Sequence, residues 1–149
     1  MKKYVAEMMG AFAIVFCGTG AVIIDGLTHG SISHAGVAIT WGLIVMTMIY
    51  TFGSNSGAHF NPAVSIAFAL ANRFPYRSLL PYIISQCAGA IAASALLRVL
   101  FPDDTLLGAT LPAGSAMQSF ILELFLSFLL MLVILHVTAA AKKKACSAA

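Results

Sequence analysis

The sequence predicts an all-α membrane protein with four transmembrane helices and one re-entrant half-helix. Of its 149 residues, 60% are hydrophobic and only 9% are charged, and the mean hydropathy is +0.96. Soluble domains carry about 25% charged residues, so this chain has too little polar surface to be covered by water. The apolar residues also gather in four long runs and one short run. These observations together indicate an integral membrane protein.

The four long apolar runs predict the membrane-spanning helices. A helix needs about 20 apolar residues to cross a hydrocarbon core of ~30 Å, and segments 4–24, 36–54, 79–100 and 117–138 have that character. The first run follows Lys2 and Lys3, but it is too long for a signal peptide and lacks a convincing cleavage site. We therefore expect one membrane domain over residues 1–149, in which 139–149 forms a low-complexity tail.

The basic residues predict the orientation. With four spans, seven of the eight Lys and Arg residues fall on the side of the two termini, and only Arg98 falls on the other. The positive-inside rule therefore places both termini in the cytoplasm. The short loops favour a multi-pass protein of the plasma (inner) membrane, with the lipid bilayer as its surroundings. The net charge of +3 is small and scattered, so nucleic acid is not expected as a partner.

The short apolar run, about 61–71, predicts a half-helix. Its length of ~16 Å reaches only halfway across the membrane, and Arg73 and Arg77 return the chain to the cytoplasmic side. Asn61 suits the N-cap and Pro62 the first helical position. The preceding residues from Gly57 have no helical pattern, and such backbone persists at membrane depth only when it is buried in protein or lines a wet cavity. A half-helix that begins at mid-membrane indicates a pore or a binding site.

The residues around this half-helix resemble a known family. The run Ser-Gly-Ala-His-Phe-Asn-Pro-Ala-Val-Ser, residues 56–65, is similar to the first Asn-Pro-Ala signature of the major intrinsic proteins, the aquaporins and aquaglyceroporins. Other features stand in the family's order and spacing, namely Ala6-Glu7, Trp41-Gly42-Leu43, Tyr82, the run 86–90 and Glu123. The resemblance covers residues 4 to about 138. It implies the first aquaporin repeat and the first helix of the second.

An internal repeat supports the same interpretation. Residues 7–12, Glu-Met-Met-Gly-Ala-Phe, and residues 123–128, Glu-Leu-Phe-Leu-Ser-Phe, share a Glu, a small residue four positions on, and a Phe. Their offset is 123 − 7 = 116 residues, so a second Asn-Pro-Ala would fall near 61 + 116 = 177, beyond Ala149. We expect the chain to lack the fifth and sixth spans, the second signature and the constriction Arg, and so to be incomplete as a channel by itself.

The resemblance implies a role for each site residue. Asn61, Pro62 and Ala63 would form the half-helix entrance at the pore centre, and the carbonyls of Gly57, Ala58 and His59 would line the cytoplasmic half. Trp41 would stand at the outer constriction. A Trp there, where water-selective members typically have Phe, resembles glycerol facilitators and nodulin-like channels, which favours glycerol and other small uncharged solutes alongside water. Glu7 and Glu123 would brace the re-entrant loops. The family's assembly implies a homo-tetramer.

Other interpretations remain open from the residues alone. Trp41 could be a packing or lipid-facing aromatic, and Glu7 and Glu123 could be interfacial charges. Several glycines most simply permit close helix contact, namely Gly10, Gly18, Gly20 and Gly89. The chain could also be a non-transporting remnant, an accessory subunit, or one half of a channel completed by another chain. No nucleophile–base pair, metal cluster or phosphate loop stands out, so neither an enzyme nor a cofactor or metal is predicted.

Overall fold

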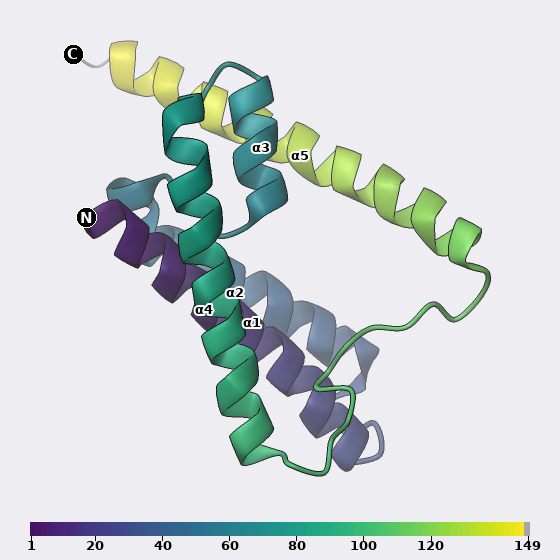
Figure 1. The fold of residues 1–149 in the computed structure, drawn as a ribbon. Helices are drawn as coiled ribbons and strands as arrows, with labels where there is room; N and C mark the ends of the chain where they lie inside the picture. Colours follow the sequence, from purple (N-terminus) through teal and green to yellow (C-terminus); the bar gives the residue numbers. More distant parts are fainter. Residues whose placement is uncertain (148–149) are drawn as a thin grey trace. The chain divides into compact units, whose positions relative to one another are not determined.

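The computed structural model describes residues 1–147, with side chains described through residue 140, and this part of the chain is helical without strands (Figure 1). The elements are α1 (Lys2–Leu27), α2 (Ser33–Ser56), α3 (Pro62–Leu70), the 3₁₀ turn η1 (Tyr76–Ser78), α4 (Leu79–Leu100) and α5 (Ala116–Ser147). Four helical segments are long and apolar enough to cross a membrane, namely Lys2–Leu27, Ser33–Ser56, Tyr76–Leu100 and Ala116–Ala140. The predicted all-α, multi-pass membrane class is confirmed.

The chain forms two compact units. The first, Met1–Ala109, contains α1 to α4, and the second, from Thr110 onward, contains α5. Helix α5 continues to Ser147, past residue 138 where the apolar run ends. Alanine and lysine are good helix formers, and no Gly or Pro interrupts residues 139–147, so the segment expected as a tail prolongs the helix. The last two residues of that tail lie outside the described residues.

In the first unit, α1 packs against both α2 and α4. Gly89 brings α4 onto the backbone of α1, because a Cβ added there would lie only 3.0 Å from the carbonyl carbon of Met8 and from the nitrogen of Phe12. The predicted role of Gly89 in close helix contact is therefore confirmed. Small residues at a crossing allow two membrane helices to approach this closely.

The glycines of α1 serve a different purpose. The space beside Gly10 is filled by the ring of Phe60, and the space beside Gly18 is filled by the ring of Trp41. A Cβ at Gly20 would make an ordinary contact of 3.5 Å with Leu97. The expectation of close helix contact is corrected for Gly10, which makes room for a ring of the loop, whereas at Gly18 the neighbouring helix α2 approaches through the ring of Trp41.

The short helix α3 lies beside the first half of α4 and packs against it (Figure 1). It has nine residues, so it is about 14 Å long, too short to cross the hydrocarbon core. Its last turn ends at Ala71, and Asn72 then adopts a left-handed conformation with φ of 57°. The chain turns there and enters η1 and α4, which run back in the opposite direction (Figure 1).

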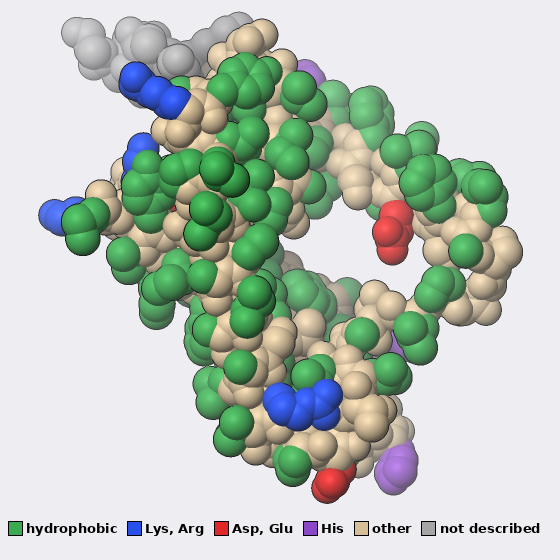
Figure 2. Space-filling model, in the orientation of Figure 1, with side chains coloured by type: hydrophobic (Ala, Val, Ile, Leu, Met, Phe, Trp, Pro, Cys, Tyr) green, Lys and Arg blue, Asp and Glu red, His purple; other side chains and the backbone are tan. Residues whose placement is uncertain are grey.

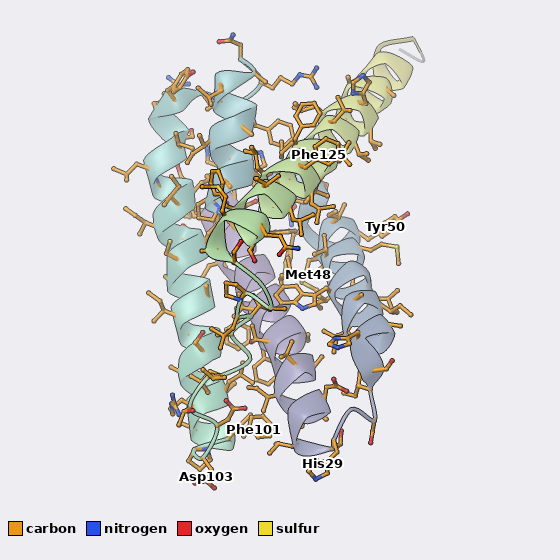
Figure 3. The ribbon with its side chains drawn as sticks, turned by 90° about the vertical axis from the view of Figure 1, so that its right-hand side faces the viewer. His29, Met48, Tyr50, Phe101, Asp103 and Phe125 are labelled. Carbon is orange, nitrogen blue, oxygen red and sulfur yellow. The ribbon has the colours of Figure 1, made fainter. Side chains whose placement is uncertain are left out.

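The surface of the first unit has the character expected in lipid. No residue of α2 is buried, and Tyr50, which is 84% exposed, points away from the helices (Figure 3). Hydrophobic side chains are spread over the face drawn in Figure 2, and few Lys and Arg side chains appear on it. His29 and Asp103, from the two connections expected on the outer side, lie at the same end of the unit (Figure 3).

Candidate functional site

The site is built around Asn61, which caps the first turn of α3. Its backbone is extended, with φ of −146° and ψ of 130°, and its Oδ1 accepts a hydrogen bond of 2.8 Å from the backbone nitrogen of Ala63. Pro62 follows at the first helical position, where the missing N–H costs least. Asn61 is exposed. Because Oδ1 is occupied by the cap, Nδ2 is the atom of this side chain that remains to donate a hydrogen bond outward.

The loop before Asn61 has an unusual backbone. Gly57, Ala58 and Phe60 all have positive φ, of 89°, 54° and 52°. Glycine adopts this region freely, but for alanine and phenylalanine it costs about 1–2 kcal/mol per residue. Such conformations persist only where the surroundings enforce them, and they cluster at functional sites. The contacts that enforce this loop therefore identify the supporting structure of the site.

The main support is the carboxyl group of Glu7 on α1, which is completely buried. Its Oε1 accepts a hydrogen bond of 3.1 Å from the backbone nitrogen of His59. Its Oε2 accepts bonds of 2.6 Å from the backbone nitrogen of Phe60 and of 2.7 Å from Nε2 of Gln86. One side chain of α1 thus joins the loop to α4. Glu7 lies about 8 Å along its helix from Lys2.

Ser65 and Gln86 extend this junction to α3. Nε2 of Gln86 also donates to Oγ of Ser65 at 3.0 Å, and the same Oγ lies 3.0 Å from Nδ1 of His59. Both side chains are buried, with 0% and 1% exposure. Oε1 of Gln86 has no hydrogen-bond partner among the described residues. The opposite orientation of the amide would set this oxygen against the carboxyl oxygen of Glu7 and lose both donated bonds, so the observed orientation is favoured.

Aromatic rings hold the loop from the other side. The imidazole of His59 stacks on Phe68 of α3, with ring centroids 4.7 Å apart and planes 14° from parallel. Phe74 and Tyr82 present their rings at 4.7 Å and 5.3 Å. The hydroxyl of Tyr82 also donates to the backbone oxygen of Ser56 at 2.7 Å. The His59 side chain is therefore fixed inside the protein, which leaves its backbone as the part that can face a solute.

The hydrogen bonds of the loop are asymmetric. The backbone N–H groups of Ala58, His59 and Phe60 donate to Oγ of Ser56 and to the carboxyl oxygens of Glu7. Within the described part of the chain, no hydrogen bond ends on the carbonyl oxygens of residues 57–59. The N–H groups of residues 58–60 are used within the protein, whereas the carbonyl oxygens of residues 57–59 accept no hydrogen bond within the described part of the chain. This arrangement suits a neutral solute that both donates and accepts hydrogen bonds.

Trp41 and Glu123 take no part in the hydrogen bonds described for this loop. Trp41 is partly buried, and its ring packs on Gly18 of α1. The 15 residues of α2 between it and Ser56 correspond to about 22 Å of helix, so it lies in the other half of the unit. Glu123 belongs to α5 in the second unit, where it is exposed. It makes no hydrogen bond or ion pair with the residues whose side chains are described.

The sequence reasoning assigned no role to three residues that complete the site. Tyr82 and Gln86 were noted only as family markers, and Ser65 only as part of the signature. A signal for Gln86 exists in the sequence, because a glutamine inside a membrane helix requires a polar partner. Ser65 lies four residues after Asn61, one helical turn further along α3. Nothing in the sequence pairs Ser65 or Gln86 with Glu7, however, because they follow it by 58 and 79 positions.

Comparisons with known proteins identify the family of the chain. The sequence matches the major intrinsic protein family over residues 1–149. It is 47% identical over 135 residues to Aquaporin NIP1-1 of Zea mays and to Putative aquaporin NIP4-1 of Arabidopsis thaliana, and 39% identical over 135 residues to Nodulin-26 of Glycine max. These alignments cover 89–90% of this chain and 47–50% of the relatives. The chain thus spans about half the length of the curated relatives it matches.

Proposed function

The chain belongs to the major intrinsic protein family, and on that premise we propose that it supplies one half of a pore for passive flux of water and small uncharged solutes such as glycerol. The resemblance to nodulin-like members is confirmed by the similarity to Nodulin-26. Proteins of this family are membrane channels and not enzymes. Which solutes this chain helps to conduct, and which partners it has, is proposed below.

The observation that carries the proposal is the exposed amide of Asn61 at the free end of a half-helix. Its Nδ2 would donate to the oxygen of a passing water or hydroxyl, while the carbonyls of Gly57, Ala58 and His59 would accept from it. The N-terminus of α3 carries a partial positive charge, which opposes cations and interrupts proton transfer along a water chain. Neutral molecules with hydroxyl groups satisfy both kinds of partner without this penalty.

Trp41 supports glycerol as a solute. At the outer constriction, an indole ring would offer an apolar face to the carbon atoms of a polyol, while polar groups bind its hydroxyls. Such a division between an apolar lining and a few polar groups is typical of small-molecule sites. We therefore propose that glycerol passes together with water, and that the pathway runs from Trp41 to the loop at residues 57–61.

A complete pore needs a second re-entrant segment opposite α3. We propose that it comes from a further segment or from a complementary half-channel chain, and that Glu123 then accepts hydrogen bonds from the second loop as Glu7 does from the first. We further propose that the protein lies in the plasma membrane with both termini in the cytoplasm and assembles as a homo-tetramer. The bias of Lys and Arg toward one side supports this orientation.

The experiment that tests the proposal measures flux through this half in a complete channel. A chimera in which residues of this chain replace the matching half of the maize relative is reconstituted in liposomes, beside this chain alone. Water and glycerol permeabilities are measured by stopped-flow light scattering. The key substitution is Asn61→Asp, which keeps a good helix cap but removes the amide donor. Asn72→Asp is the matched control, because Asn72 lies just past the opposite end of α3 and is exposed.

We expect the chimera to conduct water and glycerol, and Asn61→Asp to lower both permeabilities roughly tenfold, since the lost hydrogen bond is worth about 1.4 kcal/mol. Asn72→Asp is expected to leave them unchanged. A conducting chimera that is indifferent to Asn61→Asp would contradict the role of this residue. A folded chimera with the permeability of empty liposomes would contradict the pore itself and favour an accessory or non-transporting protein.

A further inference from the structure

We propose that Gly18 of α1 positions the ring of Trp41 and thereby determines how the outer constriction discriminates glycerol from water. The second part of this inference rests on the proposed function, whereas the first part concerns only this chain and can be tested without a working pore. No feature of the sequence pairs these two residues, which lie 23 positions apart on neighbouring helices.

The contact between the two residues is close. Gly18 is buried, and a Cβ added there would lie 2.5 Å from Cδ2 and Cζ2 of Trp41, with Cε2 nearer still. All three atoms belong to the six-membered part of the indole. Cβ atoms essentially never approach a neighbour within 3.0 Å, and an ordinary contact begins at 3.4 Å. The ring therefore occupies the volume that any side chain larger than hydrogen would need.

An alanine at position 18 would require neighbouring atoms to move. The surroundings indicate that the ring of Trp41 would be displaced. The atoms that face Gly18 belong to a side chain that is only partly buried. To restore a contact of 3.4 Å with its nearest atom, the ring must retreat by more than 3.4 − 2.5 = 0.9 Å from α1.

Two other tight glycines of this unit would respond differently. A Cβ at Gly89 would meet the backbone of α1, so a substitution there would separate two helices. A Cβ at Gly10 would meet the ring of Phe60, which is only 7% exposed and belongs to the loop held by Glu7. Gly18 is thus the position of α1 where added volume would act on the constriction aromatic rather than on the loop or on helix packing.

The direct test uses tryptophan fluorescence, because Trp41 is the single tryptophan of the protein. The purified chain carrying Gly18→Ala is compared with the wild type for its emission maximum and its quenching by acrylamide. We expect a ring displaced from α1 to emit at longer wavelength and to be quenched more strongly. The controls are Gly20→Ala, which would make an ordinary 3.5 Å contact with Leu97, and Gly26→Ala, where an added Cβ would meet nothing within 4 Å beyond its chain neighbours. Both should give the wild-type spectrum.

A second measurement covers the case in which Gly18→Ala destabilises the fold. The double variant Gly18→Ala, Trp41→Ala removes the ring that the added methyl would meet. If the contact acts through Trp41, the double variant regains the helicity and thermal midpoint of Trp41→Ala alone, as measured by circular dichroism. If both double and single Gly18→Ala variants lose the same stability, the two residues are uncoupled and the proposal is overturned.

The consequence for selectivity is tested in the chimera described above. We expect Gly18→Ala to lower glycerol permeability more than water permeability, since the larger solute is more sensitive to a displaced ring. An unchanged glycerol-to-water ratio in a conducting chimera, together with wild-type fluorescence, would overturn the inference. If the chimera shows no flux but the purified Gly18→Ala chain shows the expected shift in fluorescence, the positioning of Trp41 by Gly18 stands and the proposed function is rejected.

Discussion

Glu7 and Glu123 occupy equivalent places in two similar sequence segments, yet their surroundings differ completely. Glu7 is fully buried and accepts three hydrogen bonds, from two loop amides and from the amide of Gln86. Glu123 is exposed on α5, with no hydrogen bond among the described side chains and backbone. Both follow the pattern of Glu, a small residue four positions on, and a Phe. The pattern therefore identifies a position in the helix and does not determine what the carboxyl group does there.

The difference shows that the re-entrant loop gives Glu7 its role. A carboxyl group inside a membrane helix is costly unless donors converge on it, and the loop supplies two such donors at His59 and Phe60. In return, the carboxyl group holds a backbone in which Ala58 and Phe60 have positive φ. The loop and the carboxyl group stabilise each other, and this mutual support presents Asn61 at the start of α3.

The largest effect is expected from Glu7→Gln. The amide has one acceptor oxygen in place of two, so one or two of the three donors would face an N–H group and remain unsatisfied. Each such buried group costs about 1–3 kcal/mol, partly offset because an amide is cheaper to bury than a carboxyl group. We expect a loss of about 2–3 kcal/mol in unfolding free energy, seen as a lower midpoint of thermal unfolding in detergent.

The matched control for this prediction is Glu123→Gln, the same change at the equivalent place of the second segment. We expect no shift of the midpoint in this chain. In the complete chimera, where a second loop is proposed to reach Glu123, the same substitution should lower the midpoint. Equal shifts from Glu7→Gln and Glu123→Gln in this chain would contradict the comparison.

An intermediate effect is expected from Gln86→Leu. This change removes the amide that donates to both Glu7 and Ser65 but fills a similar volume with an apolar group. Glu7 keeps its two bonds from the loop, so the expected loss is about 1–2 kcal/mol. Gln86→Glu is a useful companion, because it sets a second acceptor against Glu7 and should be more harmful than leucine. If leucine proved the worse of the two, the hydrogen bonds of Gln86 would not be its main contribution.

The smallest effect is expected from Tyr82→Phe. The ring that packs on His59 is kept, and only the hydroxyl that donates to the backbone oxygen of Ser56 is lost. A single neutral hydrogen bond contributes about 1 kcal/mol. Tyr4→Phe provides the control. It removes the same hydroxyl group from a residue of α1 whose hydroxyl makes no hydrogen bond among the described residues. Thermal unfolding of both variants checks the prediction.

The fold could largely be predicted from the sequence because membrane spans depend on local composition. The runs at 79–100 and 61–71 need only a count of apolar residues and the cap at Asn61, and the structure has α4 and α3 in those places. The ends of the helices were harder to predict. Helix α2 begins at Ser33 rather than at residue 36, and α5 continues to Ser147. There, helix propensity rather than hydropathy decides where the helix stops.

The site could be predicted only in part. The signature around Asn61 is contiguous in sequence, and the family resemblance directed attention to Glu7. The contacts of Gln86, Ser65 and Gly18 depend on how helices α1 to α4 are rotated against one another, which hydropathy does not specify. The glycines illustrate the limit, since Gly18 and Gly89 look alike in sequence, whereas one accommodates an indole ring and the other a helix backbone.

The most direct test of the central claim, that Glu7 holds the re-entrant loop, is amide hydrogen exchange measured by mass spectrometry on the peptide that covers residues 57–61. In the wild type, the amides of His59 and Phe60 should exchange slowly because both donate to the buried carboxyl group. Glu7→Gln should make this peptide exchange faster, while Glu123→Gln leaves it unchanged. Equally slow exchange in the wild type and in Glu7→Gln would contradict the account, because the loop would then keep its conformation without the carboxyl group.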